Sequence, residues 1–269
     1  MKRQKVISRE YKVMLLPAKF GGSEKQLLKT AREFWRDFSN ATSRAVLDAD
    51  GTLENIEKRR LIGFLDTEAQ HLKGGGYIFR VRRAVEGGQP EVTLKFRHND
   101  RYVAESRRMK SRRVNAKAKF EEDIKAPFVS LYSFSATGKV GKTGIPSDLD
   151  EVSRLFPDLT KRLGEVEGSH AVREVNGFTA SEFVITGASL RIGSSPKTEA
   201  ESALIVWYDH NGSPAEPVAV EFSYRYGNAD AQYGGRTARR AFDAFQALQT
   251  DLQAWVDPNP RTKTAFVFG

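Results

Sequence analysis

One stretch, Leu61 to Arg97, limits the folds open to this chain more than any other. It contains the segments LIGFLD, YIFRVRR and VTLKFR, which read as three short strands joined by turns. In the last two, apolar and polar residues alternate with a period of two, so each strand has one apolar side and one cationic side. The connection AVEGGQP has the glycines and proline of a hairpin loop. The sequence therefore predicts two antiparallel neighbours that share a cationic surface.

Four cations occupy that surface: Arg80 and Arg82 come from one strand, and Lys95 and Arg97 come from the next. An antiparallel sheet whose polar face meets water also explains the alternation. However, the four charged positions include no acid. Two cations about 7 Å apart repel by roughly 2.4 kcal/mol at an effective dielectric constant of about 20. An enclosed patch of this composition favours a bound polyanion.

These segments also resemble the central strands of the CYTH superfamily, the triphosphate tunnel metalloenzymes. The resemblance rests on FLDT at Phe64 to Thr67, followed by FRVRR and VTLKFR. It implies a closed antiparallel β-barrel of about eight strands with flanking helices. It also implies that inward Arg and Lys side chains bind triphosphate and that inward acids hold Mg or Mn. The resemblance extends from Ile7 to about Tyr226, and residues 1–269 are expected to form a single CYTH-like domain.

The acidic motifs of this family are incomplete in the chain. Near the N-terminus, Ser8-Arg9-Glu10-Tyr11-Lys12 matches two of the three positions of the family's E-x-E-x-K strand. Later, Glu221-Phe222-Ser223 keeps one acid of an E-x-E pair. Ser8 and Ser223 thus replace two of the expected metal-binding acids. Between these motifs, Lys119, Glu121 and Asp123 resemble the family's R-x-E-x-E strand with both ends conservatively altered.

The resemblance assigns roles to particular residues. The implied phosphate-binding side chains are Lys12, Arg80, Arg82, Lys95, Arg97 and Lys119. Glu10, Glu221 and Asp209 would hold the metal, and Glu121 and Asp123 would place the metal or the attacking water. The implied reaction is phosphoanhydride hydrolysis by a metal-dependent triphosphatase.

Enzyme status stays open, because a neutral serine hydroxyl supplies no charge to a hard cation that prefers carboxylate oxygen. The alternative is a non-catalytic protein of the same fold that binds a polyanion, either phosphate or nucleic acid. A formal net charge of +9 suits phosphate-rich ligands, and it also suits nonspecific attraction to nucleic acid or an anionic membrane surface.

A basic arm from Arg101 to Lys119 contains eight Arg and Lys and one glutamate. Such charge runs are typical of solvated faces or loops. The alternative is an arm that guides phosphates or touches nucleic acid, although the interleaved aromatic residues of a single-strand binder are missing. Nucleic acid is therefore the less favoured partner.

Other features bound the class of protein. No run approaches the 18 apolar residues of a membrane span, the N-terminus lacks the apolar segment of a signal peptide, and there is no cysteine. A cytoplasmic location is expected. The four histidines show no paired metal spacing, and no GxSxG or dinucleotide-binding fingerprint is present.

The rest of the chain predicts further strands and two long amphipathic helices. The first helix begins after an N-cap at Ser23 and reaches about Asp48, where the segment DADG predicts a turn. The second runs from about Thr237 to Val256 and stops at DPNP. The further strands are expected at Ala126 to Phe134, Ala180 to Ile192, Ala203 to Asp209 and Val218 to Tyr226.

Overall fold

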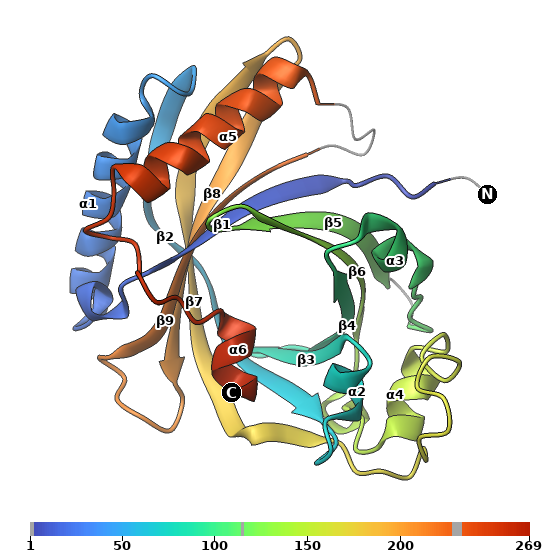
Figure 1. The fold of residues 1–269 in the computed structure, drawn as a ribbon. Coiled ribbons are helices and arrows are strands. Elements are labelled where there is room, and N and C mark those ends of the chain that lie inside the picture. Colours follow the sequence, from blue (N-terminus) through green and yellow to red (C-terminus); the bar gives the residue numbers. More distant parts are fainter. Residues whose placement is uncertain (1–2, 114–115, 228–232) are drawn as a thin grey trace.

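The computed structural model describes residues 3–113, 116–227 and 233–269. Within them, nine strands are hydrogen-bonded in the closed order β1-β5-β6-β4-β3-β2-β7-β8-β9, and β9 pairs back onto β1. Figure 1 shows these strands curving around a ring, with the long helices α1 and α5 on its outside. The strands are β1 (Ser8–Leu15), β2 (Asp48–Asp66), β3 (Tyr77–Ala84), β4 (Glu91–His98), β5 (Lys117–Lys125), β6 (Val129–Lys139), β7 (Arg173–Ser194), β8 (Lys197–Asp209) and β9 (Pro217–Tyr226).

The predicted hairpin is confirmed, since β3 and β4 pair antiparallel with Ile78 opposite Lys95. The apolar residues of both strands are buried in one cluster with Leu72, Leu149 and Val152. Those three belong to the outer helices α2 (His71–Gly74) and α4 (Leu149–Leu155). The cationic side of the hairpin consequently faces the interior of the ring.

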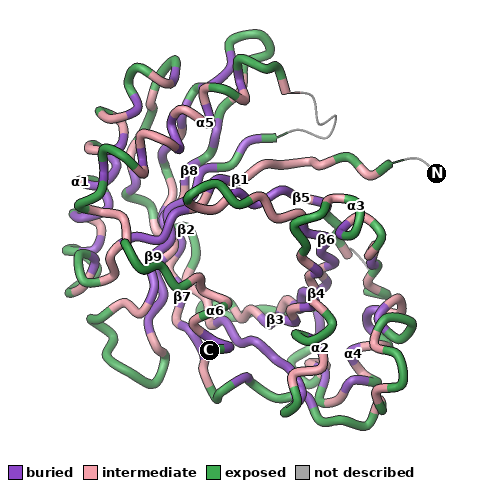
Figure 2. Tube along the Cα trace, viewed as in Figure 1, coloured by how far each residue is buried: buried purple, intermediate pink, exposed green. Residues whose placement is uncertain are grey.

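A second layer covers the opposite part of the outer face. It consists of α1 (Glu24–Thr42) and α5 (Gly235–Thr250), whose apolar stripes pack on β1, β8 and β9. The rings of Phe34 and Phe38 lie 4.8 and 4.9 Å, centroid to centroid, from the ring of Phe222. Figure 2 shows buried residues concentrated where these elements meet. The remaining short elements are η1 (Pro17–Phe20), α3 (Arg101–Ser106), η2 (Lys142–Gly144) and α6 (Lys263–Phe268).

The last helix, α6, packs on the inner face rather than the outer one. Val267 and Phe268 are buried against Phe64 of β2 and Trp207 of β8. The Phe268 and Phe64 rings meet edge to face, with centroids 6.1 Å apart. One part of the inner face is thus apolar and covered by α6, whereas the part formed by β3, β4 and β5 is charged.

A mostly antiparallel sheet with flanking helices is confirmed, but several details differ from the prediction. The ring has nine strands within the described residues rather than about eight, and β1 pairs with β5 in parallel. The two long helices end at Thr42 and Thr250, before the expected Asp48 and Val256. Among the described helices, none has the length and hydropathy of a membrane span.

The predicted turn at DADG is wrong, because this segment opens the 19-residue strand β2. Gly51 has a φ of +67°, and a Cβ there would collide with the backbone carbonyl of Gly187 in β7. The pairing register of β2 with β7 also shifts between Gly51 and Asn55. The glycine therefore marks an irregularity where two paired strands approach closely.

Candidate functional site

The charged part of the inner face is organised around Asp123 of β5. Its carboxylate lies 3.2 Å from the Lys12 ammonium of β1, 3.2 Å from the Lys95 ammonium and 3.6 Å from the Arg97 guanidinium of β4. β1 is the direct neighbour of β5 in the sheet, whereas β6 lies between β5 and β4, so Lys95 and Arg97 reach Asp123 over the inner face of β6. Asp123 is only 3% exposed. One buried carboxylate thus holds three cations from two strands.

The pKa shifts follow from this crowding. Burial alone would raise the pKa of Asp123, but Lys12, Lys95 and Arg97 outweigh it and hold that pKa well below its ordinary value. Burial lowers the pKa of Lys95 to about 8, although Asp123 acts in the opposite direction. Lys95 is therefore the cation of this cluster whose charge is lost most readily.

Arg80, from the middle of β3, differs from its neighbours. Within the described residues it has neither an ion pair nor a hydrogen bond, and its Nε is a buried donor without a partner. Burial, followed by the charge of Arg82, holds the pKa of its guanidinium well below the ordinary value. The Nε atoms of Arg82 and Arg97 are likewise buried without partners. Unused donors on cationic side chains point to an anion as the missing partner.

A second charged group lies at the β2, β7 and β9 side of the inner face. Glu182 of β7 accepts hydrogen bonds from Arg60 and, at 2.8 Å, from the Trp207 indole. Burial would raise the pKa of Glu182, but the charges of Lys263 and Arg60 lower it to about 2. Glu221 of β9 lies 3.0 Å from the Lys263 ammonium of α6. These acids are fully ionised at neutral pH and already have cationic partners.

Most side chains expected at the site share the inner face. The ammonium of Lys12 contacts Glu10 at 2.9 Å, and Arg82 contacts Glu91 at 3.1 Å. Glu91 lies on the cationic surface by the same alternation as Lys95 and Arg97, but it stands one residue before Val92, where the predicted strand began. Lys119 is peripheral: its side chain is 44% exposed and lies 3.7 Å from Glu121.

Ser8 and Ser223 also lie on the inner face. The Ser8 hydroxyl donates to Glu121 at 3.1 Å, and in the sheet Ser8 is the register partner of that residue. Ser223 is buried and is the register partner of Lys12. Both serines thus stand beside charged inner-face residues.

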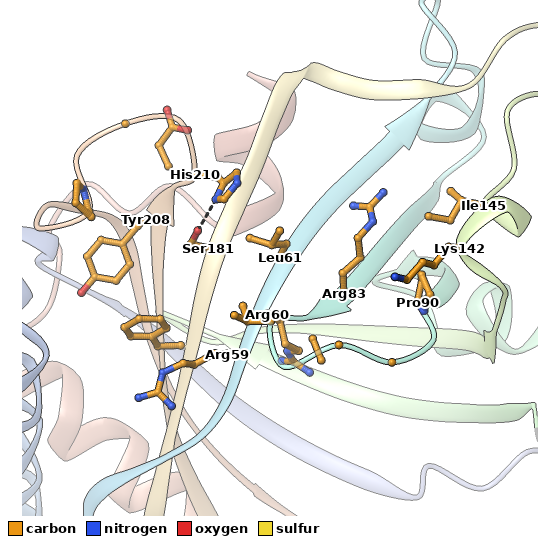
Figure 3. A pocket seen from close by; sticks show the side chains of 18 residues that line it. Arg59, Arg60, Leu61, Arg83, Pro90, Lys142, Ile145, Ser181, Tyr208 and His210 are labelled. Atoms are coloured by element: carbon orange, nitrogen blue, oxygen red, sulfur yellow. Dashed lines mark hydrogen bonds between the residues drawn. The ribbon is translucent and has the colours of Figure 1, made fainter.

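Asp209 is not brought together with Glu10 and Glu221. Its carboxylate lies at the end of β8, where it accepts the backbone N–H of Asn211 at 3.0 Å, and Asp209 is among the residues that line a groove of about 820 Å³. Figure 3 shows this groove, bordered by Arg59 and Tyr208 on one side and by Arg83 and Lys142 on the other. Asp209 thus holds the turn that follows β8, and its expected metal-binding role stays a prediction.

The basic arm lies largely against the outer face. Arg107 stacks over the Phe96 ring at 5.4 Å, and Met109 is buried in the cluster beneath α3 and α4. Residues 114 and 115 of this arm lie outside the described residues. The described part of the arm supplies no side chain to the Asp123 cluster.

Besides Glu91, the inner-face residues that escaped the sequence reasoning include Arg60, Glu182 and Lys263. Arg60 stands two residues before Ile62 and therefore shares its face, which could have been derived once that strand was known to begin before Leu61. Glu182 likewise stands two residues after Ala180 in β7 and shares its face. Nothing in the sequence indicates the position of Lys263, because the segment KTAFVF is too short to show the periodicity of a helix.

Mg or Mn, which the resemblance implies, does not fit the acids as they are arranged. Glu10, Asp123 and Glu221 are each in contact with a lysine ammonium, and Asp209 lies at the end of β8, where it accepts a backbone N–H of the following turn. A hard divalent cation needs several available carboxylate oxygens. Among the described residues, no group of three or more His, Cys, Asp or Glu side chains is arranged to hold a metal ion.

Comparison with known proteins gives structural neighbours only. No family model and no curated protein sequence matches the chain. A solved structure from Hippeastrum, described as an adenylyl cyclase with a dominant triphosphatase activity, is 13% identical, has a TM-score of 0.48, and is matched over 98% of this chain and 95% of its own. Two structures described as adenylate cyclases, from Bacillus halodurans and Vibrio parahaemolyticus, are 13% and 11% identical with TM-scores of 0.40 and 0.35.

The first of these two matches covers all of both chains, and the second covers 97% of each. All three TM-scores lie below 0.5, so these matches say nothing about the chemistry of this chain.

Proposed function

We propose that the inner face of the ring binds inorganic triphosphate or a longer polyphosphate. The observation that carries this proposal is Arg80, a guanidinium inside the ring that makes no ion pair and no hydrogen bond among the described residues and whose Nε is a buried donor without a partner. A charge removed from water without a partner is costly, and a bound phosphate would remove that cost.

The charge balance around Arg80 supports the same conclusion. Four cations lie on this part of the inner face: Lys12 pairs with Glu10 and Asp123, Lys95 and Arg97 share Asp123, and Arg80 has no ion pair among the described residues. These cations come from three strands, β1, β3 and β4. Several phosphate groups in a chain suit such a distributed arrangement better than a single small anion does, because each group can be engaged by a different strand.

Binding fits the inner face better than metal-dependent hydrolysis. Hydrolysis with Mg or Mn, as implied by the resemblance, would need Glu10, Glu221, Glu121 or Asp123 to exchange lysine or serine partners for a metal. Phosphate binding needs no such exchange, because the unused donors are already cationic. A phosphate-release assay with tripolyphosphate and Mn²⁺ tests the hydrolytic alternative, and turnover would establish it.

Tripolyphosphate is expected to raise the melting temperature of the protein in EDTA. A ligand at 100 times its dissociation constant adds about 2.7 kcal/mol to the free energy of unfolding when it binds only the folded state. Thermal melts at matched ionic strength, with sulfate as the control anion, measure this effect. An unchanged midpoint across millimolar tripolyphosphate would count against the proposal, and equal shifts with sulfate would indicate nonspecific screening.

The affinity for tripolyphosphate is expected to fall as the pH rises through about 8, where Lys95 loses its charge. Phosphate binding favours the protonated ammonium, so the complex takes up a proton and affinity changes by up to about tenfold per pH unit. Titration calorimetry at several pH values measures the slope. The variant Lys95→Arg keeps its charge and should show only the titration of the ligand itself. Identical slopes for the two proteins would exclude Lys95 from the site.

A further inference from the structure

Helix α6 brings to the inner face a positive charge that no strand supplies. The Lys263 ammonium lies 3.0 Å from a carboxylate oxygen of Glu221, and the two side chains are only 15% and 9% exposed. The same ammonium stands 5.4 Å from the centre of the Trp207 ring. Lys263 therefore lies among the acids of β9 and β7 rather than in solvent.

The position of Lys263 is fixed by the rest of α6. Val267 and Phe268 are buried in the apolar part of the inner face. The Asn176 side chain of β7 donates to the Val267 carbonyl at 2.8 Å, and Arg97 donates to the Thr264 hydroxyl at 3.4 Å. Because contacts from β7 and β4 hold this short helix, the Lys263 ammonium has a fixed position on the inner face.

Lys263 is also the one cation in direct contact with Glu221 among the described residues. Burial would raise the pKa of Glu221, but Lys263, followed by Lys12, lowers it. Ser223, which follows on the same face of β9, supplies no charge. Without Lys263, the remaining charges that act on Glu221 are Lys12 and Asp123, which oppose each other, so the buried carboxylate would be open to a cation from solution.

We propose that Lys263 is a tethered counter-cation that takes the place of a divalent metal at Glu221. Its ammonium neutralises the carboxylate, excludes Mg²⁺ or Mn²⁺ from it, and leaves the inner face able to bind polyphosphate without metal. The metal-free binding of polyphosphate rests on the proposed function. The exclusion of metal rests on the Lys263–Glu221 contact alone.

The test compares Mn²⁺ binding, followed by the electron paramagnetic resonance signal of the free ion, in four proteins. The wild type and Lys263→Arg, which keeps the charge, should not bind Mn²⁺ stoichiometrically. Lys263→Gln should bind Mn²⁺ at least about tenfold more tightly than the wild type. Lys197→Gln is the matched control, because Lys197 forms a similar 2.7 Å pair with Glu199 on the exposed part of β8 and should behave as the wild type. Equal Mn²⁺ affinity in Lys263→Gln and the wild type would overturn the proposal.

Titration of tripolyphosphate separates this proposal from the proposed function. In EDTA, the wild type should bind tripolyphosphate, and Lys263→Gln should bind it about tenfold more weakly until Mn²⁺ is added. If no protein binds tripolyphosphate, the proposed function fails while the Mn²⁺ result still decides the role of Lys263. If the wild type binds tripolyphosphate only when Mn²⁺ is present, the tethered-cation proposal fails and the proposed function stands. This wild-type comparison remains decisive even if Lys263→Gln does not fold.

Discussion

Replacing Asp123 by asparagine is expected to lower the free energy of unfolding of the ligand-free protein by about 3–5 kcal/mol, since removing one partner from a buried ion pair leaves the other charge uncompensated. Here the loss affects three cations at once, because Lys12, Lys95 and Arg97 all contact this carboxylate. Asparagine keeps the shape of the side chain, so lost charge rather than lost volume is tested. Urea unfolding at neutral pH measures the difference.

The same variant should gain more stability from tripolyphosphate than the wild type does, because the anion would neutralise the three cations that have lost the Asp123 carboxylate. Asp243→Asn serves as a control: Asp243 pairs with Arg239 on the surface of α5, 2.8 Å apart, and exposed pairs of this kind contribute about 0.3–0.5 kcal/mol. A destabilised Asp123→Asn that responds to tripolyphosphate no more than the wild type would assign Asp123 to structure alone.

Replacing Arg80 by methionine is expected to weaken tripolyphosphate binding by about 10- to 100-fold, because a hydrogen bond to a charged group contributes about 1.5–3 kcal/mol. The ligand-free protein should become more stable, by on the order of 1 kcal/mol, since the variant no longer confines a guanidinium without a partner. Loss of affinity together with gain of stability is typical of a residue kept for binding. Calorimetric titration and urea unfolding measure the two effects.

Arg83→Met is the matched control for this prediction. Arg83 lies on the same strand but on the outer face, where its guanidinium is 3.8 Å from Glu174 and 37% exposed. Its replacement should leave tripolyphosphate affinity nearly unchanged. Equal losses in Arg80→Met and Arg83→Met would move the binding site to the outer groove that Arg83 lines.

The charged half of the inner face could be predicted from the sequence because strand alternation carries the information. Once β3 and β4 are recognised, the period of two places Arg80, Arg82, Lys95 and Arg97 on one surface without any tertiary contact. The same reasoning places Glu10 beside Lys12 on β1. The interior of the ring is where these separate strand faces converge.

The parts that could not be predicted depend on long-range packing. Nothing local indicates that Lys12 and Lys95, far apart in sequence, share the carboxylate of Asp123. The strand start at Asp48 is hidden by a glycine that is needed for close approach to β7. Helix α6 is six residues long and is stabilised by the inner face on which it packs, so its sequence alone does not indicate a helix.

A crystal structure of the protein grown with tripolyphosphate in EDTA tests the central claim most directly. The account predicts one phosphate chain inside the ring, with oxygens at hydrogen-bond distance from the guanidinium of Arg80 and from Lys95 or Arg97, and with Lys263 still paired to Glu221. Tripolyphosphate bound only along the basic arm or in the outer groove near Arg83 and Lys142, with the Arg80 guanidinium still unpartnered, would contradict it.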